Sequence, residues 1–229
     1  MVKKLIIVSI IEEYYYIIKM DNWEYSVGKK RKRDNDDKDE KDFRKNGDLR
    51  DENIHSTDNH IYFYSSVTKK SMFELNKEIR YVSQKMVDLG NKYDIEPPAI
   101  KLHINSNGGS IFAAMSCIDT IITCKVPIHS IIEGAAASAA TLISVVCDKR
   151  YIKPHSFMLI HQLSTVFWGK MHEFDDEMKN LKNLMKLIKN IYKEHTKVPQ
   201  KKIDEILKHD LWWDANACKN YNLVDEILK

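Results

Sequence analysis

Apolar positions divide the chain into an irregular, charged beginning and a long stretch of regular patterns. From residue 61 onward, apolar residues recur either at every second position or at spacings of three and four. The first spacing is typical of half-buried strands and the second of amphipathic helices. These patterns predict strands at 61–67, 100–105, 128–132 and 157–161, and helices at 69–90, 111–123, 136–147 and 171–192, with a further helix after Pro199. Strands that alternate with helices indicate an α/β layered fold.

The beginning of the chain has a different composition. The run KKRKRDNDDKDEKDFRKNGDLRDEN carries blocks of charge of both signs and few apolar residues. Such a segment cannot bury enough apolar surface to offset the entropy lost on ordering. We therefore expect residues 1–55 to form a charged, disordered tail and residues 56–229 to form one folded domain.

Charge and composition exclude several classes of protein. The 36 basic and 33 acidic residues leave a net charge of only +3, which gives no case for nucleic-acid binding. The apolar stretch Leu5–Ile11 ends at Glu12, far short of the roughly 20 residues that span a membrane. The four cysteines show no CxxC pair, which argues against a structural zinc site or a disulfide scaffold. We expect a cytoplasmic protein with no membrane segment and no metal.

Two small-residue motifs mark candidate chemistry. Gly108 and Gly109 lie between an expected strand and an expected helix, where their backbone amides can approach an anion closely; a simple tight turn is the commoner use of such a pair. Ser138, in GAAASAATLIS, stands at the start of an apolar helix among alanines that leave its hydroxyl accessible. An ordinary helix cap is the alternative for Ser138.

One histidine suits the role of a general base. His161 ends the strand FMLIH, and strand ends are where layered α/β folds build their sites, although a lone histidine is more often structural. A carboxylate would have to orient its imidazole. Glu173, Asp175 and Asp176 follow at the head of the long helix, where acids also complement the helix dipole.

The ordered motifs INSNGGSIFAAMSCIDTI, EGAAASAATLIS, KRYIKPHSFMLIHQ and NLVDEIL resemble the Clp protease proteolytic subunit family. The resemblance implies the ClpP/crotonase-like fold, a spiral of β-β-α units with a long handle helix. Matched motif by motif, it makes Ser138 the nucleophile and His161 the general base, with the amides of Gly109 and Ala139 as oxyanion-hole donors.

The resemblance leaves the third member of the triad less certain. An ungapped count from His161 through Gly169 puts Glu173 at the position of the family's aspartate, with Asp176 as its competitor. By the same matching, Asp210 corresponds to an acid in the family's ring-contact motif, where His209 replaces the usual arginine.

The function implied is that of an ATP-dependent Clp-type serine endopeptidase. It would hydrolyse polypeptide substrates inside a chamber of heptameric rings, as a homo-oligomer that works with an AAA+ unfoldase and needs no cofactor. Two alternatives remain: a non-catalytic ClpP-like ring subunit, and a crotonase-like acyl-CoA enzyme.

Overall fold

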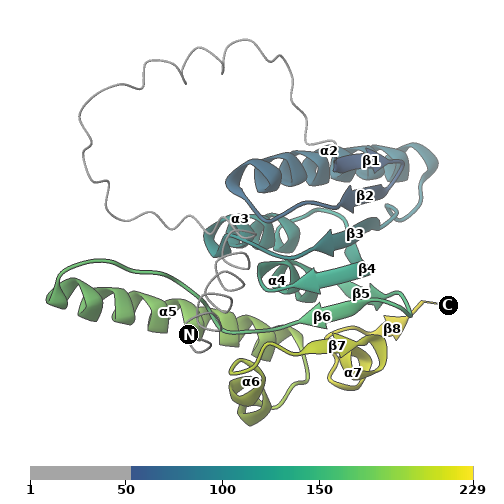
Figure 1. The fold of residues 1–229 in the computed structure, drawn as a ribbon. Coiled ribbons are helices and arrows are strands. Elements are labelled where there is room, and N and C mark those ends of the chain that lie inside the picture. Colours follow the sequence, from purple (N-terminus) through teal and green to yellow (C-terminus); the bar gives the residue numbers. More distant parts are fainter. Residues whose placement is uncertain (1–52, 229) are drawn as a thin grey trace, which may run out of the picture. The chain divides into compact units, whose positions relative to one another are not determined.

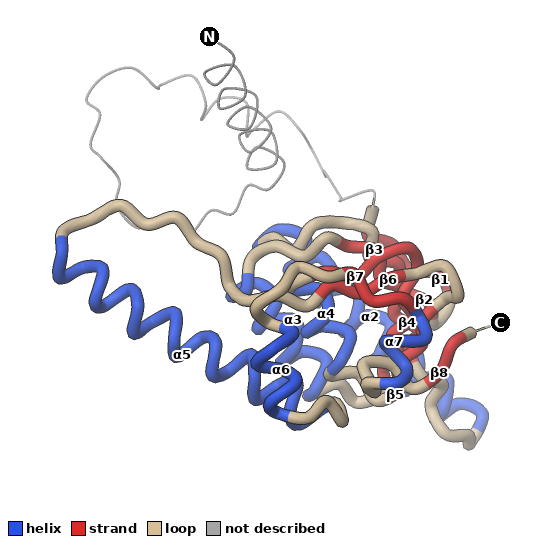
Figure 2. Tube along the Cα trace, turned by 60° about the horizontal axis from the view of Figure 1, so that its bottom comes forward, coloured by secondary structure: helices blue, strands red, loops and turns tan. Residues whose placement is uncertain are grey.

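A computed structural model describes residues 53–228. The charged tail expected at 1–55 therefore lies almost entirely outside the described residues. The α/β architecture is confirmed: a mixed sheet carries helices on one face, and a long helix extends beyond it (Figures 1 and 2). The strands are β1 (Ile54–Thr57), β2 (His60–Phe63), β3 (Ile100–Ser106), β4 (Ile128–Ala137), β5 (Lys149–Ile152), β6 (Phe157–Leu159), β7 (Trp212–Asp214) and β8 (Glu226–Ile227).

The sheet branches at β4, the longest strand. Its first half pairs with β3 and β5 in the order β1-β2-β3-β4-β5-β8, in which β1 and β2 are antiparallel and the other neighbours are parallel. The second half of β4 pairs instead with β6, parallel, and β6 pairs with β7, antiparallel. A register shift between Ile104 and Ser106 of β3 accompanies this change of partner. In this second half, Ala135–Ala137 of β4 pair in register with Phe157–Leu159 of β6.

Three helices cover one face of this sheet (Figure 2). They are α2 (Lys69–Tyr93), α3 (Ile111–Ile122) and α4 (Ala139–Val145). The apolar stripe predicted for α2 is confirmed, since Met72, Leu75 and Ile79 are buried against fully buried strand residues such as Leu102 and Ile104. Burial of apolar surface stabilises a fold by about 25 cal/mol per Å², so the packing of these helices on the sheet contributes to the stability of the domain.

Several predicted boundaries were wrong, including the strand expected over 61–67, which ends at Phe63, and the strand expected over 128–132, which continues to Ala137. The helix expected to end at Gly90 continues to Tyr93 and ends with Asp94 in the left-handed conformation. The helix expected from residue 136 begins only at Ala139, because Ala136 and Ala137 belong to β4 and pair with β6. Alanine favours helices in isolation, but here the tertiary pairing decides the conformation.

The long helix α5 (Met171–His195) is the predicted handle, and only part of it packs on the domain. Its C-terminal half buries Ile188, Ile191 and Tyr192, whereas its N-terminal half extends away from the sheet (Figures 1 and 2). The chain then returns through α6 (Gln200–Ile206) to β7, α7 (Ala215–Asn220) and β8.

A partly buried ion pair fixes the returning end of the chain to the sheet. The guanidinium of Arg150 on β5 donates to both oxygens of the Asp225 carboxylate, with Nη2–Oδ1 at 2.6 Å and Nε–Oδ2 at 3.2 Å, and also to the carbonyl of His195. Burial alone would raise the pKa of Asp225, but the hydrogen bonds and charge of Arg150 outweigh it and lower the pKa.

We expect this pair to make the fold sensitive to acid. Because the pKa of Asp225 is lower in the folded state, its contribution to stability is present above the ordinary aspartate value of about 3.9 and is lost as the pH falls through the folded-state pKa. Asp225→Asn should lower the Tm at pH 7 and should flatten the dependence of Tm on pH below about 4. Thermal unfolding between pH 7 and pH 3 tests this, with the exposed Asp119→Asn as control. Parallel curves for Asp225→Asn and the wild type would contradict it.

Candidate active site

Ser138 lies at a strained turn between β4 and α4. Its backbone has φ 54° and ψ −125°, a conformation that residues other than glycine rarely adopt. Holding a residue in it costs about 1–3 kcal/mol. The amide of Ser138 donates to the carbonyl of Leu159 on β6 at 2.8 Å, which holds the turn. Strain of this kind, fixed by surrounding contacts, is typical of nucleophiles presented at the end of a strand.

The glycine pair packs directly against this turn. A Cβ on Gly108 would lie 2.5 Å from the carbonyl oxygen of Ala137, 2.8 Å from the Cβ of Ser138 and 3.0 Å from the amide nitrogen of Ala139. Gly108 also has φ 91°. Only glycine therefore fits beside Ser138, and the lack of a side chain brings the glycine backbone close to the amide of Ala139.

The amide of Gly109 is directed away from the strand pairing beside it. Val67 donates to the carbonyl of Gly108 and accepts from the amide of Ser110, both at 2.7 Å. In such a parallel bridge Gly109, which lies between Gly108 and Ser110, points its N–H away from Val67. The amide of Gly109 is therefore not used in this pairing, and the amide of Ala139 directly follows Ser138, so both are candidate donors for an oxyanion hole.

The register of three strands brings His161 to the same edge of the sheet. Ala137 of β4 pairs with Leu159 of β6, and Leu159 pairs with Trp212 of β7. Continued beyond the last pairs, this register puts Ser138 beside Ile160 and His161 opposite Asp210. This register therefore places Ser138, His161 and Asp210, which are far apart in the sequence, near the ends of three adjacent strands.

Asp210 is the carboxylate that the structure places beside the imidazole. Its Oδ1 lies 3.7 Å from Nδ1 of His161. The histidine side chain is 18% exposed and the aspartate 78%. The separation is longer than a hydrogen bond, as catalytic contacts often are before substrate binds. Because Nδ1 faces Asp210, Nε2 of His161 is the ring nitrogen that can accept a proton from a nucleophile.

The structure does not bring Glu173 to His161. The carboxylate of Glu173 accepts a hydrogen bond from the amide of Lys170 at 2.7 Å, which closes the first turn of α5 at the end of the helix that extends from the domain (Figure 1). Asp176 pairs with Lys179 on the same helix at 3.3 Å. Glu173 therefore has the role of a helix cap here. Counting along the chain from His161 pointed to Glu173, because the carboxylate that lies beside His161 in space, Asp210, comes only after α5 and α6.

Behind Ser138, two buried hydroxyl groups connect its carbonyl to the handle. Oγ1 of Thr141 donates to the carbonyl oxygen of Ser138 at 2.5 Å and lies 2.6 Å from the hydroxyl of Tyr192. Burial raises the pKa of Tyr192, so its hydroxyl stays protonated and can donate. This chain of hydrogen bonds was not predicted, because a tyrosine and a threonine 51 residues apart give no local signal.

With Ser138 as the nucleophile that the sequence resemblance implies, we expect Tyr192→Phe to lower kcat for peptide hydrolysis several-fold with little change in KM. Loss of one buried hydrogen bond costs about 1 kcal/mol and frees the Ser138 turn to move. Thr141→Val should cost more, because it also removes the donor to Ser138, and Thr141→Ser should retain most activity. Steady-state kinetics on a fluorogenic peptide measures this, with Tyr221→Phe, a half-buried tyrosine beside Trp213, as control. An unchanged kcat for Thr141→Val would show that the pair serves packing alone.

No helix between 53 and 228 is long and apolar enough to cross a bilayer. Within the same range, no group of three or more His, Cys, Asp or Glu side chains is arranged to hold a metal ion.

Comparisons with known proteins give one consistent result. The Clp protease family model matches residues 56–229. An ATP-dependent Clp protease proteolytic subunit 1 of Chlamydia pneumoniae is 29% identical over 172 residues, which cover 73% of this chain and 85% of that protein. An ATP-dependent Clp protease proteolytic subunit of Deinococcus radiodurans is 29% identical over 131 residues, 56% of this chain and 64% of that protein. In fold, the structure is similar to a point mutant of ClpP1 from Listeria monocytogenes, with a TM-score of 0.63 at 23% identity, covering 72% of this chain and 88% of that chain.

Proposed function

Because this chain belongs to the Clp protease family, we propose that it is a Clp-type serine endopeptidase whose triad is Ser138, His161 and Asp210. Asp210 takes the place that the sequence had suggested for Glu173. The observation that carries the proposal is the convergence at one sheet edge of a strained serine, a histidine and a carboxylate on that histidine. Three independent strands supply these groups, which is hard to explain as packing.

Each group has a defined task in the proposed reaction. His161 takes the proton of the Ser138 hydroxyl as the oxygen attacks a peptide carbonyl, and Asp210 holds and stabilises the imidazolium that forms. The amides of Gly109 and Ala139 donate to the oxyanion of the tetrahedral intermediate. His161 then protonates the leaving amine. In the second half of the reaction His161 takes a proton from water as the water attacks the acyl group, and it returns that proton to the Ser138 oxygen as the ester bond breaks. The mechanism uses only groups of this chain.

The rival functions account for less of this geometry. A non-catalytic ring subunit does not need a serine with φ 54° beside a carboxylate-paired histidine. A crotonase-like acyl-CoA enzyme would use the same kind of oxyanion hole, but it would not need Ser138, His161 and Asp210 at the ends of adjacent strands.

Exposed apolar side chains support assembly of several subunits. Val166 and Trp168 are 90% and 94% exposed, and Met171 at the start of α5 is 88% exposed. Monomeric proteins rarely expose such a run of large apolar groups. We propose that another copy covers it, in a homo-oligomer of heptameric rings that receives polypeptide substrates from an AAA+ unfoldase in the cytoplasm.

Hydrolysis of a fluorogenic peptide by the purified, assembled protein tests the proposal. The wild type should release the fluorophore, and Ser138→Ala and His161→Ala should each reduce the rate to near the uncatalysed level. Ser110→Ala, next to the glycine pair but outside the triad, is the control. Hydrolysis that is the same in wild type and Ser138→Ala would refute the assignment.

A further inference from the structure

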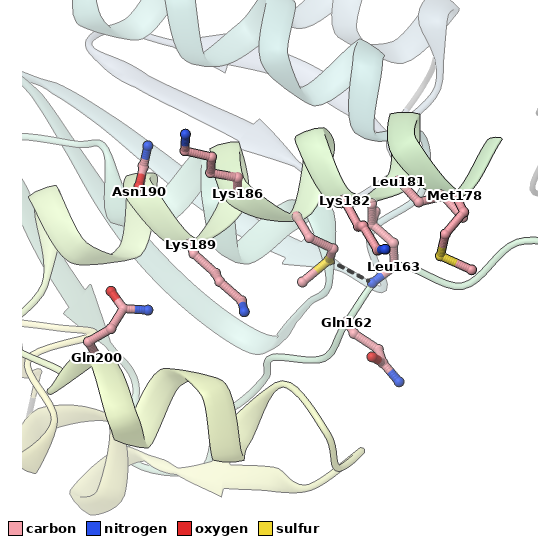
Figure 3. Close-up of a pocket in the computed structure, with 10 residues that line it drawn as sticks. Gln162, Leu163, Met178, Leu181, Lys182, Lys186, Lys189, Asn190 and Gln200 are labelled. Atoms are coloured by element: carbon pink, nitrogen blue, oxygen red, sulfur yellow. Dashed lines mark hydrogen bonds between the residues drawn. The ribbon is translucent and has the colours of Figure 1, made fainter. Parts of the chain in front are cut away.

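A groove beside the proposed triad carries positive charge. It has a volume of about 640 Å³ and lies between the segment after His161, helix α5 and the start of α6 (Figure 3). From its lining, we propose that this groove selects acidic segments of the polypeptide substrate. The inference rests on the proposed function, since it assigns a substrate class to the same site.

The groove is continuous with the proposed active site. Gln162 and Leu163 line it and directly follow His161 in the chain. The amide of Leu163 donates to the sulfur of Met185 on α5 at 3.4 Å, and the amide of Gln162 donates to the carbonyl of Leu207 at 3.0 Å. This short segment is therefore held against α5 and against Leu207, and it connects His161 to the groove.

The lining combines an apolar floor with basic walls. Leu163 and the α5 residues Met178, Leu181 and Met185 supply apolar surface at helical spacing. Lys182 and Lys189 lie seven residues apart on the same side of α5, where Lys182 extends toward Leu163 and Lys189 toward α6, whereas the Lys186 side chain points away from α6 (Figure 3). The lining residues include no carboxylate.

Part of this positive charge is not balanced within the domain. Lys189 pairs with Asp204 of α6 at 2.7 Å. Lys182 and Lys186 have no ion-pair partner among residues 53–228. The unpaired ammonium group of Lys182 over an apolar floor, with the charge of Lys186 on the next turn of α5, is complementary to a peptide that carries Asp or Glu side chains between apolar ones.

Binding to a catalytically silent protein tests this selectivity directly. Three fluorescein-labelled peptides of equal length, with Glu, Gln or Lys at the variable positions around the same apolar residues, are titrated into assembled Ser138→Ala protein and followed by anisotropy. We expect the Glu peptide to bind most tightly. Adding Lys182→Gln and Lys186→Gln should weaken the Glu peptide about 3- to 10-fold while the Gln peptide changes little, and higher salt should reduce the difference.

The matched control is Lys179→Gln. Lys179 is exposed on the same helix, pairs with Asp176 and does not line the groove, so this change should leave the affinity of the Glu peptide unaltered. Equal affinities for the three peptides, or an equal loss in Lys179→Gln, would overturn the proposal. Binding of the Glu peptide only to dissociated subunits would also overturn it, by showing that a second copy covers the groove. Because binding does not require hydrolysis, failure here is distinct from failure of the proposed peptidase.

Discussion

Asp210→Asn should lower kcat for peptide hydrolysis by about 10⁴-fold while leaving the fold intact. An amide cannot stabilise the imidazolium that forms on His161, and it favours the wrong tautomer of the neutral ring. The Asp210 side chain is 78% exposed and lies 3.7 Å from Nδ1 of His161, so its replacement should have little effect on packing or on Tm. Steady-state kinetics and thermal unfolding of the same preparations measure the two effects separately.

Glu173→Gln is the matched control for this prediction. The same acid-to-amide change at the start of α5 affects only the hydrogen bond to the amide of Lys170, for which the amide oxygen of glutamine can substitute. We expect kcat to stay within about 3-fold of the wild type, since capping changes of this kind cost only about 1 kcal/mol. Near-normal activity in Asp210→Asn combined with a large loss in Glu173→Gln would return the triad assignment to Glu173.

The second large effect is expected for Gly108→Ala. The added methyl group would meet the carbonyl of Ala137 at 2.5 Å and the amide of Ala139 at 3.0 Å, both of them backbone atoms that cannot rotate away. The φ of 91° adds strain for any side chain. The turn that carries Ser138 must then shift, and with it the oxyanion donors, whose loss alone costs about 10²- to 10³-fold in kcat. We expect at least that loss, together with a lower Tm.

Gly169→Ala is the control for the effect of adding a methyl group. There the new Cβ would meet only the far ends of the Glu173 and Phe167 side chains, at 2.5 and 2.7 Å, and these can move. Its activity should remain within a few-fold of the wild type. If Gly108→Ala retained normal kcat, the close packing of the glycine against the Ser138 turn would have no catalytic importance.

The sequence predicted the regular helices and strands because their cores are periodic. The stripe of α2 and the alternation of β3 were visible without any tertiary information. The short strands β1, β5 and β7 were missed, since three or four residues are too few to show a period and form only against their neighbours. The start of α4 was misplaced for the same reason, because pairing with β6 extends β4 through two alanines.

The candidate site divides along the same line. Local motifs pointed to Ser138, His161 and the glycine pair as candidates, and each of them follows the end of a strand. The carboxylate could not be located by counting along the chain, because the whole of α5 and α6 lies between His161 and Asp210. Only the antiparallel pairing of β6 with β7 brings these two residues together. Asp210 was present in a matched motif, but its sequence context suggested ring contact.

The most direct measurement of the central claim is active-site labelling with a fluorophosphonate, which reacts only with a serine that a neighbouring base activates. The assembled wild-type protein should incorporate one label per chain, and peptide mapping should locate it on Ser138. Labelling should be absent in Ser138→Ala, strongly slowed in His161→Ala and Asp210→Asn, and normal in Glu173→Gln. A wild-type protein that assembles but takes up no label, or that carries the label on another serine, would contradict the account.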